Sequence, residues 1–283
     1  MWKVERPAIN ATQLYQTCVA GVRNQDLRAR LQLIEPLIGE ACEDYEFSAN
    51  AGLLHTIPVS TVVGNVTRQE LKGVYGNGMV RGSSPGRPTY DAIMSTPRSG
   101  RCPLCGHRRV STLDHHLPQA LYPAFSVAPL NLVPACRDCN TAKLTLVAAT
   151  AEESTLHPYF DDVEASRWLL AELREQVPPT VRFRPQPPQN WPAVLAARVR
   201  NHFATFKLGT LYASEAADEL RAIQSTLTKL LAAGGPAAVR DFLAEAAESC
   251  QQVFPNWWRT AAYEALQASP WFCEGGFLGA VVN

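Results

Sequence analysis

CPLCGHRRVSTLDHHLPQALYPAFSVAPLNLVPACRDCNTAK, residues 102–143, is the stretch that decides the fold. It begins with one Cys-x-x-Cys pair, Cys102 and Cys105, and ends with a second, Cys136 and Cys139. Each pair places two thiolates on one tight turn, and two such turns complete the tetrahedral ligand set of a structural zinc ion. A redox dithiol would need only one pair. The spacing therefore predicts a four-cysteine zinc site.

The gap between the two pairs is long enough to hold further structure. Thirty residues separate Cys105 from Cys136, whereas a simple zinc ribbon has roughly 15–20. Alternation over Arg109–Asp114 predicts a strand, Leu130–Pro134 fits a second strand, and a helical pattern starts at Ala135. One face of that helix would carry Cys136, Cys139, Asn140 and Lys143.

This strand–loop–strand–helix stretch resembles the HNH endonucleases, which have the ββα-metal (His-Me finger) fold, and in particular their zinc-knuckle subtype. The matching motifs are Asp114-His115-x-x-Pro118, Asn131-Leu132-Val133 and Cys136-x-x-Cys139-Asn140-x-x-Lys143. They cover about 42 of the 283 residues, in the order and with the local spacing of the family. The flanking regions lie outside the resemblance.

The resemblance implies a role for each polar residue of these motifs. His115 would be the general base that activates water for attack on a phosphodiester. Asp114 would bind a catalytic Mg²⁺ or Mn²⁺ ion, with Asn140 as the second ligand, where many members have a final His. Asn131 would hold the hairpin loop and orient His115. Lys143 would contact a phosphate or support the structure.

The chemistry of these groups agrees with such a role. A neutral imidazole with a pKa of about 6.5 accepts a proton at physiological pH. A hard cation held by one carboxylate and one amide oxygen keeps most of its coordination sphere open for a phosphate. If the first strand ended one residue early, His116 would be the base instead of His115. The Asp-His-x-x-Pro spacing favours His115.

Composition places the chain among folded globular proteins. It has 283 residues, of which 46% are hydrophobic and 18% charged, with a formal net charge of zero. No apolar run reaches the roughly 20 residues of a membrane span, and the N-terminus lacks the apolar core of a secretory signal. We therefore expect a cytoplasmic protein. His107 is an alternative zinc ligand, and the remaining cysteines are expected to be buried thiols: Cys18, Cys42, Cys250 and Cys273.

The fold class expected is α+β and mostly helical, in three parts. A helical N-terminal region spans residues 1–95, the HNH module with its zinc knuckle spans 96–160, and a helical C-terminal region spans 161–283. Further predicted elements are a helix from a capping box at Thr67-Arg68-Gln69-Glu70 to Tyr75, helices over Ala142–Ala151 and Asp162–Gln176, a strand near Val181–Phe183, and helices over 193–252 separated near Gly209 and Gly234-Gly235-Pro236.

Positive charge is concentrated in two parts of this neutral chain. Residues 68–109 carry eight Lys or Arg against two acids, and residues 174–207 carry six against one. Such stretches are typical of a surface that binds a polyanion, although an exposed basic loop without a ligand is an alternative. Beside the cysteines, the predicted nucleic-acid contacts are Arg101, Arg108, Arg109 and Lys143.

The sequence thus predicts a metal-dependent endonuclease that acts on DNA. Free-standing HNH proteins of this size resemble effectors of bacterial restriction or anti-phage systems, which implies a separate ATPase or sensor subunit as partner. Two alternatives are a non-catalytic, zinc-stabilised adaptor that binds nucleic acid or protein, and an RNA-cleaving toxin on the same fold. The adaptor explains the cysteines and the basic stretches, but not the combination of Asp114, His115 and Asn140.

Overall fold

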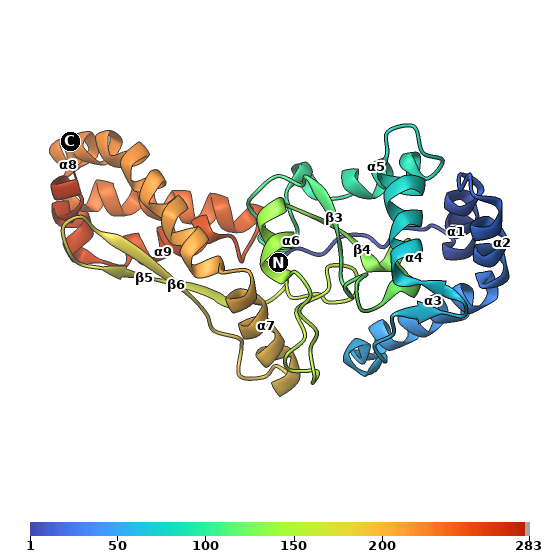
Figure 1. Ribbon diagram of the computed structural model, residues 1–283. Coiled ribbons are helices and arrows are strands. Elements are labelled where there is room, and N and C mark those ends of the chain that lie inside the picture. The colour runs from blue at the N-terminus through green and yellow to red at the C-terminus, as the bar shows by residue number, and fades with distance from the viewer. Residues whose placement is uncertain (281–283) are drawn as a thin grey trace. The chain divides into compact units, whose positions relative to one another are not determined.

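The computed structural model describes residues 1–280 and divides the chain into two compact units, Met1–Asp162 and Val163–Asn283 (Figure 1). Each unit combines helices with small, two-stranded antiparallel sheets. The prediction of a mixed α+β chain that is mostly helical is therefore confirmed. Throughout the described residues, each helix is too short or too polar to cross a membrane.

The first unit contains five helices that precede a β-hairpin and a short helix. Strand β3 pairs with β4 in antiparallel register, with Asp114 opposite Val133 and His115 opposite Leu132. Helix α6 follows β4 directly, so the expected order of strand, loop, strand and helix is present. The bounds are α1 (Ala11–Ala20), α2 (Gln25–Leu33), α3 (Glu35–Ala51), β1 (Val62–Val63), β2 (Val66–Thr67), α4 (Arg68–Tyr75), α5 (Arg87–Ser95), β3 (Thr112–His115), β4 (Leu132–Ala135) and α6 (Arg137–Lys143).

One hydrophobic core connects the hairpin to the N-terminal helices. Leu113 of β3 and Leu132 of β4 are buried in the same cluster as Leu31 of α2, Leu71 of α4 and Ile93 of α5. Burial of such side chains stabilises each by about 1.5–3 kcal/mol relative to exposure. The helical region before residue 95 and the cysteine-rich stretch therefore hold each other in place.

Helix α4 begins with the predicted capping box. The Thr67 hydroxyl accepts a hydrogen bond from the Glu70 amide, and the Glu70 carboxylate accepts one from the Thr67 amide at 2.9 Å. Arg30 of α2 donates to the same carboxylate and to the Asn65 carbonyl at 3.1 Å. Glu70 thus caps α4 and also ties it to α2, which fixes the direction in which α4 leaves the β1–β2 hairpin.

The prediction that the helix continues over Ala142–Ala151 is wrong. Helix α6 ends at Lys143, and Leu144 adopts a positive φ of 45° that reverses the chain. Leu144 and Leu146 are 67% and 58% exposed, so a longer helix would have no core for its apolar side chains to cover. At its other end, α6 begins after Ala135, because Ala135 still belongs to β4 and Cys136 is the N-cap residue.

The second unit begins with a hairpin where a helix was expected. The prediction of a helix over Asp162–Gln176 is wrong, since β5 (Leu169–Arg174) pairs with β6 (Thr180–Pro185) in antiparallel register. Leu173 lies opposite Val181, which is buried. The apolar residues of this segment satisfy both a helical and a strand period, and the partner strand decides between the two. The strand predicted near Val181–Phe183 is confirmed within β6.

Three helices complete the second unit: α7 (Ala193–Thr205), α8 (Leu208–Val253) and α9 (Trp258–Gln267). Lys207 has a positive φ of 50° between α7 and α8, close to the separation predicted at Gly209. Gly235 has φ 68° and ψ −165°, so α8 is interrupted where Gly234-Gly235-Pro236 predicted a separation. The second break follows from local chemistry, because glycine adopts such angles freely and proline cannot continue a helix.

Replacing Glu70 by Gln should lower stability in a pH-dependent way. The hydrogen bond from Arg30, followed by that from the Thr67 amide, lowers the pKa of Glu70 to about 2, against about 4.3 in an unfolded chain. A depressed pKa stabilises the fold above the unfolded value and loses that effect as pH falls toward the folded value. We expect the free energy of unfolding of the wild type to exceed that of Glu70→Gln by about 1 kcal/mol at neutral pH. Urea unfolding should show this difference shrinking between about pH 5 and pH 3, and a constant difference would contradict the role of the charge.

Candidate functional site

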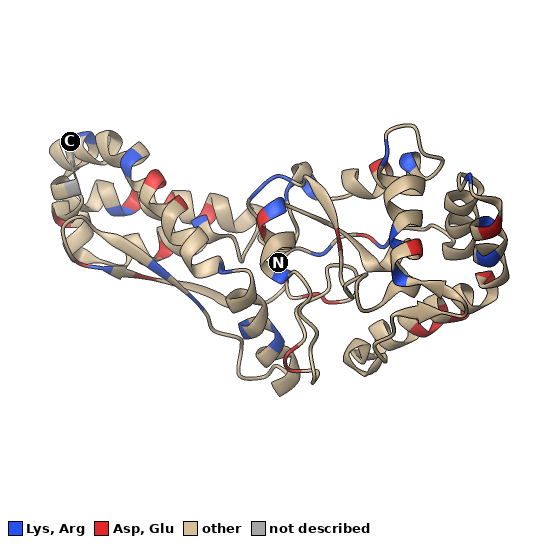
Figure 2. Cartoon of the chain, in the orientation of Figure 1, with Lys and Arg blue, Asp and Glu red and all other residues tan. Residues whose placement is uncertain are grey.

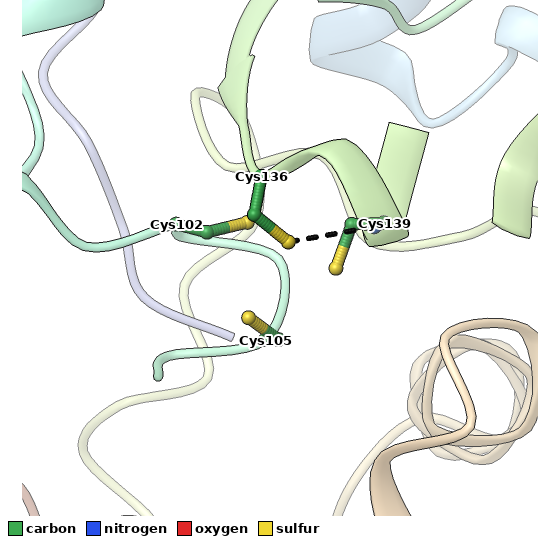
Figure 3. Close-up of side chains that lie close together, drawn as sticks. All are labelled: Cys102, Cys105, Cys136 and Cys139. Carbon is green, nitrogen blue, oxygen red and sulfur yellow. Dashed lines mark hydrogen bonds between the residues drawn. The ribbon is translucent and has the colours of Figure 1, made fainter. Parts of the chain in front are cut away.

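Four buried cysteine side chains converge beside the start of α6 (Figure 3). The sulfur atoms of Cys102, Cys105, Cys136 and Cys139 all lie within 4.8 Å of one another. Tetrahedral zinc with Zn–S bonds of about 2.3 Å places its sulfur ligands about 4 Å apart. Donor type, number and spacing therefore all fit a structural zinc ion. His107 does not belong to this group of ligand atoms.

The backbone around the cysteines has the tight turns that such a site needs. The Gly106 amide donates to the Cys102 carbonyl at 2.8 Å, with Gly106 at a positive φ of 64°. In the second turn the Cys139 amide donates to the Cys136 sulfur at 3.4 Å, as the dashed line in Figure 3 shows. Hydrogen bonding among the thiols lowers the pKa of Cys136 and raises that of Cys139, so the four side chains share their protons, which metal binding would displace.

A surface cavity of about 280 Å³ lies where β3, α4 and α6 meet. Its lining includes Asp114 and His115 from the end of β3, Asn140 from α6, Lys72 from α4 and residues 118–120 of the loop after β3. Three of the four residues predicted to act in catalysis, Asp114, His115 and Asn140, therefore lie around one space. Asp114 and His115 come from β3 and Asn140 comes from α6, with the 16-residue β3–β4 connection and β4 between them in the sequence. The pairing of β3 with β4 closes this connection.

His115 is held in a defined orientation. Its Nε2 atom lies 2.8 Å from the Ser126 carbonyl oxygen. A carbonyl only accepts, so this bond places the proton on Nε2 and leaves Nδ1 as the basic nitrogen. The Tyr75 ring packs edge-on against the imidazole with centroids 4.6 Å apart. Burial lowers the pKa of His115 to about 4, so the ring is neutral at physiological pH.

Asp114 is buried together with the ammonium group of Lys143. The Lys143 Nζ lies 3.2 Å from the Asp114 carboxylate and donates to the His115 carbonyl at 2.6 Å. Burial raises the pKa of Asp114, and the Lys143 charge opposes that rise. Lys143 was a predicted nucleic-acid contact, but its side chain is 4% exposed and its contacts are internal.

Asn131 holds the connection between β3 and β4. Its side-chain oxygen accepts from the Leu117 amide at 2.7 Å, and its side-chain nitrogen donates to the carbonyls of Leu117 at 3.0 Å and Phe125 at 3.2 Å. Ser126, which directly follows Phe125 in the chain, supplies the carbonyl that orients His115. Asn131 therefore has the contacts expected of a residue that positions His115 through the loop.

His116 lies in a different environment from His115. Its ring packs against the His157 ring in a tilted arrangement, with centroids 4.2 Å apart, and it is not part of the cavity lining. The His157 Nε2 is within 3.1 Å of both the Leu130 carbonyl and the Tyr45 hydroxyl, and Tyr159 donates to the Leu132 carbonyl at 2.8 Å. Tyr45, His157 and Tyr159 therefore support the start of β4. No local sequence pattern indicated the role of Tyr45.

The predicted arginine contacts lie around the zinc knuckle instead of the cavity. Arg108 pairs with Asp138 at 2.9 Å, and the Arg101 guanidinium donates to the His107 carbonyl. Arg109 is exposed. The basic side chain that lines the cavity is Lys72, which was counted only as part of a basic stretch. Its place one turn after Arg68 on a capped helix was readable from the sequence, but its position at the cavity was not.

Comparison with known proteins gives one informative similarity. The chain is similar to Protein ea31 of Escherichia phage lambda, with 28% identity over 296 aligned residues that cover 97% of this chain and 100% of the phage protein. No family model matches the chain. No solved structure matches it either. The similarity to the phage protein runs along the whole length, and its name states no activity.

The cysteine cluster should bind one zinc ion per chain. In metal analysis, the Cys139→Ser variant should contain far less than one zinc ion per chain, because three thiolates bind zinc far less tightly than four. Loss of several kcal/mol of binding free energy should lower the melting temperature by about 10 °C or more. Cys250→Ser, outside the cluster, is the matched control and should keep its zinc. Equal zinc content in both variants would refute the site.

Removing the Asn131 side chain should destabilise the fold more than removing an exposed asparagine. Asn131→Ala leaves the buried amide and carbonyl of Leu117 without partners, at about 3 kcal/mol in total. The Phe125 carbonyl keeps its hydrogen bond from the Ala128 amide. Asn77 is exposed, so Asn77→Ala should change stability by less than about 0.5 kcal/mol. Equilibrium unfolding in urea compares the two variants. Similar values for both would show that the loop does not depend on Asn131.

Proposed function

We propose that this protein is a metal-dependent endonuclease of the HNH type that hydrolyses phosphodiester bonds of DNA. The observation that carries the proposal is the cavity lined by Asp114, His115 and Asn140. A zinc-stabilised adaptor gives no reason for an oriented imidazole and an amide to lie around one space with this carboxylate. The resemblance of residues 102–143 to the HNH motif supports the same function.

His115 would act as the general base. Its Nε2 proton is directed to the Ser126 carbonyl, so Nδ1 can accept the proton of an attacking water molecule. The water oxygen forms a bond to phosphorus, the bond from phosphorus to the 3′ oxygen breaks, and the leaving oxygen takes a proton from solvent. Tyr75 and the Asn131-bound loop keep the imidazole in place for this step.

Asp114 and Asn140 would hold the divalent cation, Mg²⁺ or Mn²⁺. A cation bound there would neutralise charge on the phosphate and on the departing oxygen. Lys143 already neutralises Asp114 at 3.2 Å, so metal binding has to compete with a buried ammonium group. We therefore expect weak affinity for the cation and a requirement for millimolar concentrations.

The contact between Lys143 and Asp114 also favours a second candidate function. A chain in which this carboxylate serves only as a partner for Lys143 would be a zinc-stabilised adaptor that binds nucleic acid or protein. The partner ATPase or sensor and the role in restriction or anti-phage defence stay predictions that follow from the resemblance. The cytoplasmic location stays a prediction from the hydrophobicity pattern of the sequence.

Cleavage of supercoiled plasmid with Mg²⁺ or Mn²⁺ tests the proposed function. Wild type should cut, and His115→Ala should lose about 100-fold or more of the rate, because a general base contributes about that much. His116→Ala is the matched control, since His116 lies outside the cavity lining. Zinc content and melting temperature of each variant show whether it is folded.

Each outcome of the plasmid experiment has a defined meaning. Loss in His116→Ala alone would keep the nuclease and shift the base by one residue. Equal cutting by all three proteins would indicate a contaminating nuclease. Absence of cutting with zinc bound would contradict DNA cleavage, and a parallel reaction with single-stranded RNA would then separate an RNA-cleaving toxin from the adaptor.

A further inference from the structure

Helix α4 contributes a wall of the cavity, although it lies outside the stretch that resembles HNH nucleases. Lys72 lines the cavity together with Asp114 and His115. Arg68, one turn earlier on the same face, donates to the Ala120 carbonyl at 3.4 Å and so connects α4 to the loop that forms another wall. Tyr75, at the end of the helix, contacts the His115 ring.

The charges around the cavity leave Lys72 without compensation. The negative charge of Asp114 is balanced by Lys143 at 3.2 Å. Within residues 1–280, Lys72 is exposed and forms no ion pair. The ammonium group of Lys72 therefore gives the cavity a net positive charge, which favours the binding of an anion.

The backbone that carries Lys72 is fixed before any ligand binds. The Thr67–Glu70 capping box and the Arg30–Glu70 ion pair hold the start of α4. On the opposite side of the helix, Leu71 and Val74 are buried in the hydrophobic core that connects the β3–β4 hairpin to the N-terminal helices. The main entropy cost of binding an anion at Lys72 would then be the ordering of one side chain, so little of the binding free energy would be lost.

We propose that Lys72 binds a phosphate group of the nucleic-acid strand that occupies the cavity, so that α4, and not the zinc-knuckle arginines, supplies the phosphate contact at this site. The strand is thereby placed with a phosphodiester beside Asp114 and His115. Figure 2 shows that Lys and Arg residues lie on α4 and close to it. The nature of the ligand rests on the proposed function, whereas the contact itself can be measured without cleavage.

Salt-dependent DNA binding tests this contact. Fluorescence anisotropy with a labelled 20-base-pair duplex would be measured for the 283-residue chain carrying His115→Ala, which prevents cleavage, and for the same protein with Lys72→Gln added. One lost phosphate contact should reduce the slope of log Kd against log salt by about 0.9 and weaken binding roughly threefold to tenfold at low salt. Lys72→Arg should keep most of the affinity.

The matched control is Lys229→Gln, an identical loss of charge at an exposed position of α8. A reduced slope for Lys72→Gln with an unchanged slope for Lys229→Gln supports the contact. An unchanged slope for Lys72→Gln, equal losses in both variants, or no DNA binding at all would overturn it. If wild type fails to cut plasmid but the slope still falls only with Lys72→Gln, then the nuclease proposal fails while the phosphate contact stands.

Discussion

The ammonium group of Lys143, buried between the Asp114 carboxylate and the His115 carbonyl, ties helix α6 to the end of strand β3. A buried charge is tolerated only when it is paired and hydrogen-bonded, and losing one partner of such a pair typically costs about 3–5 kcal/mol. The four cysteines fix the other end of α6 against the knuckle that begins at Cys102. The position of Asn140 relative to His115 depends on both attachments. The geometry of the cavity is therefore set by the Lys143–Asp114 ion pair and by the cysteine cluster.

The N-terminal helices are part of the same construction. Glu70 begins α4 and connects it to Arg30 of α2, and the buried side of α4 shares a core with both strands of the hairpin. In this way Tyr75 reaches His115 and Lys72 reaches the cavity. The helical region is therefore more than a covering for the cysteine-rich stretch, because one of its helices supplies side chains to the site.

Features that depend on local chemistry could be predicted from the sequence. The cysteine cluster followed from spacing, and the start of α4 followed from Thr67 and Glu70. Features that depend on distant partners could not. The segment at Leu169–Arg174 forms a strand because Thr180–Pro185 pairs with it, and its own apolar period is ambiguous. The sequence left both a phosphate contact and a structural role open for Lys143, and only the folded hairpin shows that its ammonium group is buried against Asp114. The proximity of Asp114, His115 and Asn140 agrees with the motif, whereas the place of Lys72 depends on how α4 meets β3.

The shortness of α6 sets a rule for how this segment can evolve. Its N-cap residue and first turn carry Cys136 and Cys139, and its last residue carries the ion pair with β3, all within residues 136–143. One inserted or deleted residue would rotate everything beyond it by about 100° and shift it by 1.5 Å along the axis. An insertion or deletion directly after Cys139 would then move Asn140 out of the cavity and separate Lys143 from Asp114, while the cysteines stayed in place. Divergence should therefore proceed through substitution at an exposed position such as Arg137, with the length of the helix kept constant.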